Sequence, residues 1–277
     1  MRRLMLATLA ILAFAATTPS LAAEATAKPE RQSWSFAGPF GTYDRGQLQR
    51  GFKVYREVCS VCHSLKYVAF RSLAEAGGPG FTEAQAKTVA SEFRINDGPN
   101  DRGEMFERPG RLSDSIPSPD ANEQAARARF NGALPPDLSV IAKARSYEVG
   151  FPGFIIDAFK QYQESGVDYV YAYITGYENP PAGETLPPTQ FWNKYFPGHR
   201  TAMRPPLQKD QVEYSDGTPQ TIEQYSRDVT AFLMWAAEPH LEARKRIGFQ
   251  AMIFLVVFAG LLYFTKKKIW SKVEGHA

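Results

Sequence analysis

Two long apolar runs occupy the ends of this 277-residue chain, and mixed apolar and polar residues fill the part between them. The C-terminal run, residues 247–264, reads IGFQAMIFLVVFAGLLYF and contains no charged residue. Its length is about the minimum for a helix that crosses the hydrocarbon core of a membrane. Only Gln250, near its start, is polar enough to mark a solvent face, which argues against a core helix. The pattern therefore predicts a transmembrane anchor over residues 247–264.

Basic residues follow this anchor directly, at Lys266, Lys267, Lys268 and Lys272. Lysines and arginines gather on the cytoplasmic side of membrane helices. We therefore expect residues 265–277 to form a cytoplasmic tail, with the rest of the chain on the opposite side of the membrane.

The N-terminal run has the layout of a secretory signal peptide. Arg2 and Arg3 precede an apolar stretch from Leu4 to Ala16, and the small residues of SLAA follow it. An uncleaved anchor is the alternative, but the apolar stretch is short for a spanning helix. We expect residues 1–23 to be a signal peptide and residues 24–246 to form a periplasmic domain.

Helical periodicity is clearest in two parts of this domain. Apolar residues recur at near-helical spacing in residues 47–58, and residues 221–237 form the best-defined amphipathic helix. A further helix is expected to start at Asp120, because Glu123 follows three residues later as in a capping box. A short helix capped by Asp137 is expected after the prolines of NGALPPDLS.

The rest of the domain gives sparse strand signals. Residues 97–119 are rich in glycine, proline, aspartate and arginine, which predicts a long exposed loop. Residues 167–175, VDYVYAYIT, are dense in aromatic residues and fit either a strand or a buried helix. A run this short does not distinguish the two.

Charge and cysteine content exclude two classes of protein. Residues 24–246 hold 26 basic and 28 acidic residues, so the domain is near neutral and lacks the basic footprint of a nucleic-acid-binding protein. The whole chain contains two cysteines, which excludes a disulfide framework.

Both cysteines lie in the sequence CSVCH, where Cys59, Cys62 and His63 make a C-x-x-C-H motif. This spacing is the signature of covalent c-type haem attachment. Residues three apart on a helical turn share one face, so two thiols can reach one edge of a porphyrin. The adjacent histidine then serves as an axial ligand of the iron. A thioredoxin-like redox pair lacks its βαβ context here, and a zinc site lacks a second Cys/His pair.

The sixth ligand of the iron decides between electron transfer and small-molecule chemistry. Three residues remain as candidates after those in the predicted signal peptide, helices and tail are set aside: Met203, His199 and Met105. Met203 is favoured, because the prolines of YFPGHRTAMRPPL make its loop stiff and lower the entropy lost on binding. His199, Met105 and an empty position stay as alternatives.

Several segments, in this order, resemble the cytochrome c1 family, the haem-bearing subunits of quinol–cytochrome c oxidoreductases, in its bacterial form. They are CSVCHSL, FNGALPPDLS, DYVYAYITGY, YFPGHRTAMRPPL and YSDGTPQTIEQYSRDVTAFLMWAAEP, followed by the C-terminal apolar run. The resemblance implies an all-α fold: a class I cytochrome c-like haem domain with long loops and one C-terminal transmembrane helix.

The same resemblance implies roles for individual residues. It implies one haem c bound through Cys59 and Cys62, with iron ligands His63 and Met203. It places Asn131, Ala133, Pro135 and Pro136 in the haem pocket, and Arg145 and Tyr169 at the haem propionates. A guanidinium group suits a carboxylate geometrically.

Two features depart from the pattern of this family. Residues 150–166 are longer than in mitochondrial relatives, and the chain has no further cysteine to brace them. We expect this insertion to be held by the packing of its apolar residues, Phe154, Ile155, Ile156 and Phe159. Arg204 directly follows Met203, and a cation beside the iron would favour the reduced form.

The resemblance implies an electron carrier that is not an enzyme by itself. It would accept one electron from a Rieske iron–sulfur protein and pass it to a soluble or tethered cytochrome c. It would also contact cytochrome b through the anchor helix, within a dimeric complex in the bacterial inner membrane. The alternatives are a haem sensor or peroxidase-like enzyme with a displaceable sixth ligand, and a membrane-tethered cytochrome outside any complex.

Overall fold

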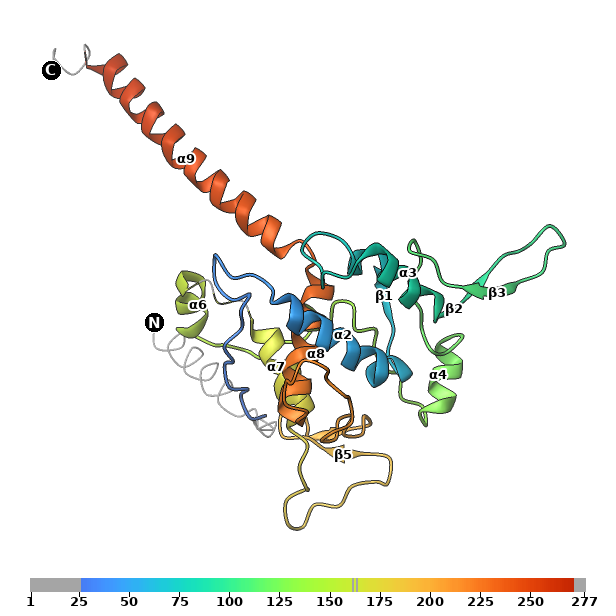
Figure 1. Cartoon of the computed structure of the whole chain (residues 1–277). Coiled ribbons are helices and arrows are strands. Elements are labelled where there is room, and N and C mark those ends of the chain that lie inside the picture. Colours follow the sequence, from blue (N-terminus) through green and yellow to red (C-terminus); the bar gives the residue numbers. More distant parts are fainter. Residues whose placement is uncertain (1–25, 161, 163, 272–277) are drawn as a thin grey trace, which may run out of the picture.

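The computed structural model describes residues 26–271, apart from residues 161 and 163. The predicted signal peptide and the last six residues of the predicted tail lie outside this range. Figure 1 shows a mainly helical domain from which one long helix projects. The prediction of a mostly helical domain with a single C-terminal anchor helix is confirmed.

Two helices form the centre of the domain. They are α2 (Arg45–Glu57) and α8 (Ile222–Ala237), and they match the two periodic segments of the sequence. The helices meet closely at Gly51, where an added Cβ would lie 2.1 Å from the carbonyl oxygen of Asp228. Aromatic side chains fill the interface around Phe232, which packs on Phe52 and Tyr55. Burial of such large apolar surfaces supplies most of the stability of a domain.

Shorter elements surround this pair. The remaining helices of the domain are η1 (Cys59–Val61), η2 (Phe70–Leu73), α3 (Glu83–Ser91), α4 (Glu123–Arg129), α5 (Ile141–Ala144), α6 (Gly153–Lys160) and α7 (Ser165–Thr175). The strands form three antiparallel pairs: β1 (Leu65–Ala69) with β4 (Ser115–Ile116), β2 (Arg94–Asp97) with β3 (Phe106–Pro109), and β5 (Phe191–Trp192) with β6 (Arg200–Thr201). In the described part of the chain, no sheet exceeds two strands.

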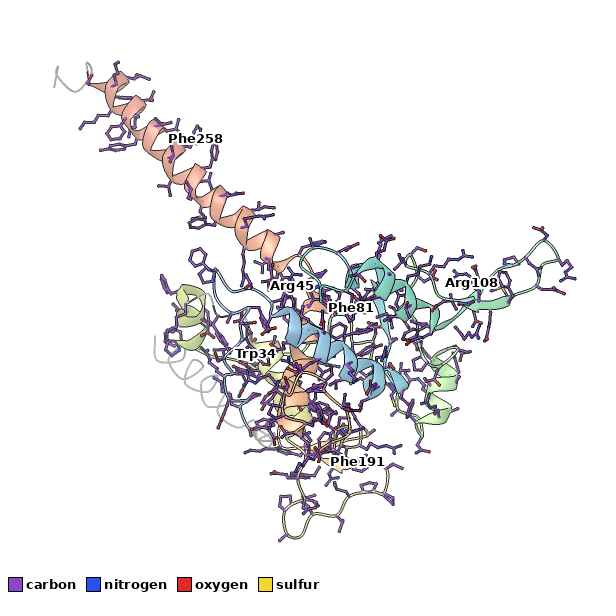
Figure 2. All side chains as sticks on the ribbon, viewed as in Figure 1. Trp34, Arg45, Phe81, Arg108, Phe191 and Phe258 are labelled. Atoms are coloured by element: carbon purple, nitrogen blue, oxygen red, sulfur yellow. The ribbon has the colours of Figure 1, made fainter. Side chains whose placement is uncertain are left out.

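The structure corrects the expected loop over residues 97–119, which contains the last residue of β2 and the whole of β3 and β4. Every cross-strand pair of the β2–β3 hairpin contains one charged residue opposite an uncharged one, so the hairpin lacks the apolar alternation that marks a half-buried strand. Arg108 holds the region together, because its guanidinium binds both Asp97 and Asp114. Figure 2 shows Arg108 at the base of the projecting hairpin.

Both predicted helix caps are wrong in detail. The N-cap of α4 is Asn122, whose side chain accepts a hydrogen bond from the Ala125 N–H, and Asp120 forms an ion pair with Arg129 instead. The short helix α5 begins after Val140 and has no side-chain cap, whereas Asp137 binds the residues after His63. In both places the carboxylate binds a different partner, Arg129 for Asp120 and the distant residues Ser64 and Lys66 for Asp137, which a capping pattern does not reveal.

The undecided run of residues 167–175 is helical and forms most of α7. Its first turn carries the fully buried Asp168, whose carboxylate accepts hydrogen bonds from Trp34 and Tyr162. The helix lies against α8 and α5. These contacts between residues far apart in the sequence decide the conformation that periodicity left open.

The insertion at residues 150–166 forms α6 and the start of α7. The prediction that its apolar side chains pack inward is wrong, because Phe154, Ile155, Ile156 and Phe159 are all exposed. The helix is instead held by Asp157, which faces inward and binds Arg31 at 2.5 Å.

The anchor helix α9 (Leu241–Trp270) has 30 residues and extends beyond the predicted span at both ends. It is long and apolar enough to cross a membrane, and its side chains are exposed around the helix, as Figure 2 shows near Phe258. Its first turns belong to the domain: Glu242 accepts a hydrogen bond from the Tyr43 N–H, and Lys245 donates one to the Phe36 carbonyl.

Candidate haem site

The C-x-x-C-H motif forms a single tight turn directly after α2. The N–H groups of Cys62 and His63 both donate to the carbonyl oxygen of Cys59, at 3.1 and 2.9 Å. Tyr55, buried in the core, donates from its hydroxyl to the His63 carbonyl at 3.0 Å. The end of α2 therefore fixes the turn, and the turn brings the two thiols and the imidazole together.

The environment of Cys59 suits an uncharged sulfur. Cys59 packs against the hydrophobic core, and this burial, with a smaller contribution from Cys62, raises its pKa to about 12. A thioether carries no charge, so the surroundings that disfavour a thiolate do not disfavour a sulfur bonded to haem.

The imidazole of His63 is oriented by a backbone carbonyl. Its Nδ1 atom lies 2.8 Å from the carbonyl oxygen of Pro136, and the residue is only 9% exposed. A carbonyl can only accept, so Nδ1 carries the proton and Nε2 of the neutral ring keeps a free lone pair. Burial lowers the pKa of His63, which favours this neutral form. The ring therefore has the protonation pattern of a metal-binding histidine with its outer nitrogen held in place.

The carbonyl of Pro136 is itself held in position by its neighbour Asp137. The Asp137 carboxylate accepts hydrogen bonds from Ser64 Oγ at 2.7 Å and from the Lys66 N–H at 2.8 Å. Burial of this carboxylate acts to raise its pKa, but the hydrogen bonds it accepts outweigh burial and hold the pKa below the ordinary value. Asp137 thus ties the segment after α4 to Ser64 and Lys66, the residues that follow His63.

The predicted pocket residues lie on one connection between α4 and α5. Asn131 has a left-handed backbone with φ of 52°, and the Ala133 N–H donates to the Phe130 carbonyl. Arg129, in the last turn of α4, donates to the carbonyl of Val61 within the C-x-x-C-H turn at 2.7 Å. The chain therefore reverses at Asn131 and runs through Pro135 and Pro136 to the imidazole.

Arg145 and Tyr169, the two residues predicted to bind the propionates, lie near each other on neighbouring elements. Arg145 ends α5, and Tyr169 lies on α7. Gly166 brings the two helices into contact, since an added Cβ there would lie 2.0 Å from the Ala142 carbonyl oxygen. Burial raises the pKa of Tyr169, and the guanidinium of Arg145 is close enough to lower it in part.

The loop with Met203 is fastened by two tyrosines that the sequence reasoning missed. Tyr177 donates from its hydroxyl to the Met203 carbonyl at 3.1 Å, and Tyr173 shares a hydrogen bond of 2.7 Å with Thr201 Oγ1. The Met203 N–H donates to the same Thr201 oxygen. The signal in the sequence was the four-residue spacing of Tyr169, Tyr173 and Tyr177, which places them along one face of α7 and its end.

The two alternative ligands have other surroundings. His199 stacks on Trp192 with ring centroids 4.8 Å apart, and its Nδ1 lies 3.1 Å from the Asn193 carbonyl oxygen. This histidine is thereby part of the β5–β6 turn. Met105 is 66% exposed on the β2–β3 hairpin.

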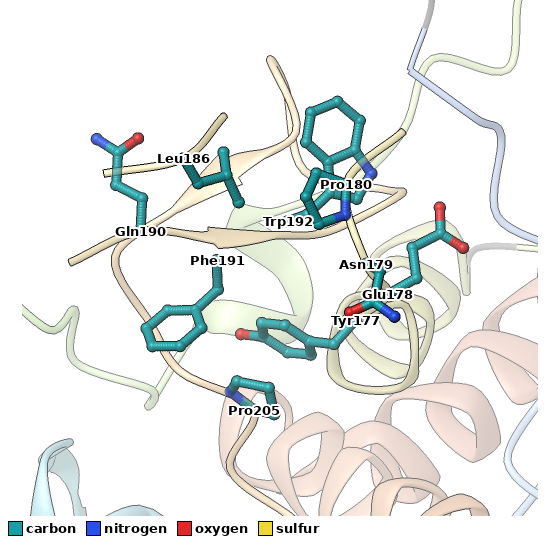
Figure 3. Close-up of a pocket in the computed structure, with 9 residues that line it drawn as sticks. All are labelled: Tyr177, Glu178, Asn179, Pro180, Leu186, Gln190, Phe191, Trp192 and Pro205. Atoms are coloured by element: carbon teal, nitrogen blue, oxygen red, sulfur yellow. The ribbon is translucent and has the colours of Figure 1, made fainter. Parts of the chain in front are cut away.

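A surface pocket of ≈ 440 Å³ lies beside the Met203 loop. Figure 3 shows the ring of Tyr177 next to Phe191 and Pro205 in its wall. The pocket is lined by the tyrosine that holds Met203 and by the proline two residues after it. This side of the loop is therefore supported by packed rings.

The helical domain, the C-x-x-C-H turn with its oriented histidine and the single anchor helix define the class of membrane-anchored c-type cytochromes. The model of the Cytochrome C1 family matches residues 34–273. The chain belongs to the cytochrome c1 family, whose members bind haem and serve electron transport in the respiratory chain.

Curated relatives agree with this family. The chain is 49% identical over 266 residues to cytochrome c1 of Blastochloris viridis, covering 95% of this chain and 94% of that protein. It is 44% identical over 262 residues to mitochondrial cytochrome c1 of Saccharomyces cerevisiae, covering 92% and 78%. It is 62% identical over 249 residues to cytochrome b/c1 of Bradyrhizobium diazoefficiens, covering 90% of this chain and 36% of that longer protein.

Proposed function

We propose that this chain is the electron-carrying cytochrome c1 subunit of a quinol–cytochrome c oxidoreductase. It takes one electron from a Rieske iron–sulfur protein and passes it to a soluble or tethered cytochrome c. The observation that carries this proposal is the hydrogen bond between His63 Nδ1 and the Pro136 carbonyl, because it leaves Nε2 free and aimed by a rigid backbone.

In this proposal Cys59 and Cys62 would bind one haem c covalently, and His63 and Met203 would ligate its iron. Haem with two such ligands supplies a reversible one-electron change and leaves no coordination position for a substrate. The fastening of both ligand segments supports this role. Pro136 holds the imidazole, and Tyr177 holds the backbone of Met203. Rigid ligands keep the geometry similar in both oxidation states.

The remaining predicted residues shape the pocket around the haem. Asn131, Ala133, Pro135 and Pro136 line it on the side of His63. Arg145 and Tyr169 bind the propionates, because a guanidinium and a phenol can both donate hydrogen bonds to carboxylates. Their closeness across the α5–α7 contact supports a shared ligand.

The chain is oriented with residues 24–246 on the periplasmic side and residues 265–277 in the cytoplasm. The lysines after the anchor support this orientation. Residues 1–23 act as the signal peptide, and residues 247–264 contact cytochrome b within a dimeric complex in the bacterial inner membrane. The name of the Bradyrhizobium relative, cytochrome b/c1, supports the neighbourhood of cytochrome b.

Purification of the full chain from its native membrane in mild detergent tests this function. We expect a b-type cytochrome and an iron–sulfur protein to co-purify with it. A pyridine haemochrome spectrum should show a haem with both vinyl groups converted to thioethers, and Cys62→Ala should shift the spectrum to that of a single thioether. A haem with two intact vinyl groups, or a chain that purifies alone, would contradict the proposal.

A further inference from the structure

Helix α6 exposes its apolar side chains and buries its acidic one. Phe159 and Phe154 are 86% and 58% exposed, and Ile155, Ile156 and the preceding Phe151 are also exposed. Asp157 is the buried residue of the helix. A helix on the surface of a water-soluble domain has the opposite arrangement. Contiguous exposed apolar surface of this kind marks a contact with a partner or a membrane.

The orientation of α6 is set by specific bonds. The guanidinium of Arg31 binds both carboxylate oxygens of Asp157, at 2.5 and 2.6 Å. The same guanidinium lies 4.4 Å from the ring centre of Tyr162, beyond the end of the helix. Turning α6 over would break this ion pair, in which both carboxylate oxygens of Asp157 bind Arg31. The apolar face therefore points outward by construction.

Glu164, in the connection between α6 and α7, lies near the first turns of the anchor helix. Burial lowers the pKa of Lys245 in α9, and the carboxylate of Glu164, four residues after α6, is close enough to act against this lowering. Glu164 also adds to the effect of burial in raising the pKa of Tyr43, which is bonded to α9. Figure 1 likewise shows α6 at the end of the domain from which α9 departs.

A second exposed aromatic residue touches the anchor itself. Phe40 is 71% exposed, and its ring lies 5.4 Å from that of Phe249, the third residue of the predicted span. The loop carrying Phe40 is bonded to α9, because Lys245 donates to the carbonyl oxygens of Phe36 and Gly41. Phe40 is thus held at the level where α9 enters the hydrocarbon.

We propose that α6 and Phe40 form an interfacial surface, made of Phe40, Phe151, Phe154, Ile155, Ile156 and Phe159, which lies in the headgroup–acyl boundary of the bilayer. A lipid surface fits better than a protein partner, because the patch adjoins an anchor helix whose own exposed side chains are apolar and suit lipid. Lys160 ends α6, and Arg246 directly precedes the apolar run of the anchor, which suits cations that reach lipid phosphates.

Such a surface would fix the tilt of the haem domain. A single helix leaves a domain free to rotate and lean about the point where it enters the membrane. Contact through α6 adds a second attachment beside the helix, and Phe40 adds a third. This inference depends on α9 spanning a membrane and is independent of the route of the electron.

Spin labelling of the full chain in its complex, reconstituted in phosphatidylcholine nanodiscs, tests the surface. Single cysteines replace Phe159, Phe154 or Phe40 and carry a nitroxide, and wild type without an added cysteine gives the background. Collisions with oxygen, which dissolves in lipid, are compared with collisions with a water-soluble nickel chelate. Met105→Cys is the matched control, because Met105 is similarly exposed on the hairpin at the opposite side of the domain.

We expect the oxygen-to-nickel accessibility ratio at Phe159, Phe154 and Phe40 to exceed that at Met105 severalfold. A ratio equal to that of Met105 would place the surface in water and overturn the proposal. Exclusion of both reagents would overturn it as well, by showing that another subunit of the complex covers α6. The readout does not depend on haem or on electron transfer, so its failure would leave the proposed function untouched.

Discussion

The hydroxyl of Tyr177 lies 3.1 Å from the carbonyl oxygen of Met203, so a residue just beyond the C-cap of α7 holds the loop predicted to supply the sixth iron ligand. Tyr177→Phe removes this hydrogen bond and keeps the ring. We expect unfolding free energy to fall by about 1 kcal/mol, the usual net value of one such bond. The freed loop should also let the reduced variant bind carbon monoxide, which the wild type is expected not to bind, and an optical difference spectrum measures this.

Tyr171→Phe is the control for this variant. Tyr171 is also on α7, but its ring packs edge-on against Trp34, away from the Met203 loop. Like the wild type, it should bind no carbon monoxide when reduced. If Tyr177→Phe lowers stability without gaining carbon monoxide binding, Tyr177 supports the fold and Met203 is not held against the iron by it.

Gly166 sets the distance between α5 and α7 and so the pairing of Arg145 with Tyr169. Gly166→Ala would place a Cβ 2.0 Å from the Ala142 carbonyl oxygen and 2.5 Å from that of Arg145. We expect unfolding free energy to drop by about 1–3 kcal/mol, as for other overpacked sites. Because Arg145 also shifts away from Tyr169, the haem midpoint potential should change, as measured by redox titration.

The matched control is Gly46→Ala. Gly46 is exposed in the first turn of α2, where an added Cβ meets nothing closer than 3.4 Å. Alanine is the better helix former, so stability should stay equal or rise by up to about 1 kcal/mol, with no change in potential. A Gly166→Ala protein as stable as wild type would show that the α5–α7 contact is looser than it appears.

The haem-binding motif could be read from the sequence because its chemistry is local. Cys59, Cys62 and His63 lie within one turn, so their spacing alone predicts that their side chains lie close together. The bond from His63 to Pro136 was beyond such reading, because its acceptor is a backbone carbonyl and every residue has one. Tyr173 and Tyr177 were visible as a spacing of four, but their partners lie on a distant loop.

The errors in the predicted fold share a physical cause. The apolar residues of α6 were expected to pack inward, and periodicity cannot tell a protein core from a lipid surface, since both accept apolar side chains. The orientation of α6 is set by Asp157, which forms an ion pair with Arg31, a residue far away in the sequence. The β2–β3 hairpin was hidden for a related reason, since Arg108 and two carboxylates hold it in place of apolar pairs.

That hairpin should respond to acid before the core does. Hydrogen bonds from Arg108 hold the pKa values of Asp97 and Asp114 below the ordinary value for aspartate. A lowered pKa stabilises the folded form fully above the unfolded value of about 3.9, and this stabilisation is lost as pH falls through the lower folded value. We expect amides of residues 94–109 to lose protection from hydrogen exchange as pH falls below about 4.

Arg108→Gln supplies the comparison. Without the guanidinium, protection of the hairpin should be weaker at neutral pH and nearly independent of pH down to the same range. Mass spectrometry after exchange, corrected for intrinsic rates, measures both proteins. Equal pH profiles for the two would mean that the carboxylates do not hold the hairpin through Arg108.

The identity of the sixth ligand can be settled with three variants of the same chain. Met203→Leu removes the thioether and keeps an apolar side chain of similar volume. We expect the reduced wild type to bind no carbon monoxide and the variant to bind one per haem, with a lower midpoint potential, because the thioether stabilises reduced iron. His199→Gln and Met105→Leu remove the other candidates. They should leave the sixth position of the iron occupied, because His199 stacks on Trp192 and Met105 is exposed to solvent.

Carbon monoxide binding by the untreated wild type would instead indicate an open or displaceable site, as in a sensor or peroxidase. Binding gained only in His199→Gln would transfer the ligand role to that histidine, and the stiff loop around Met203 would then need another explanation.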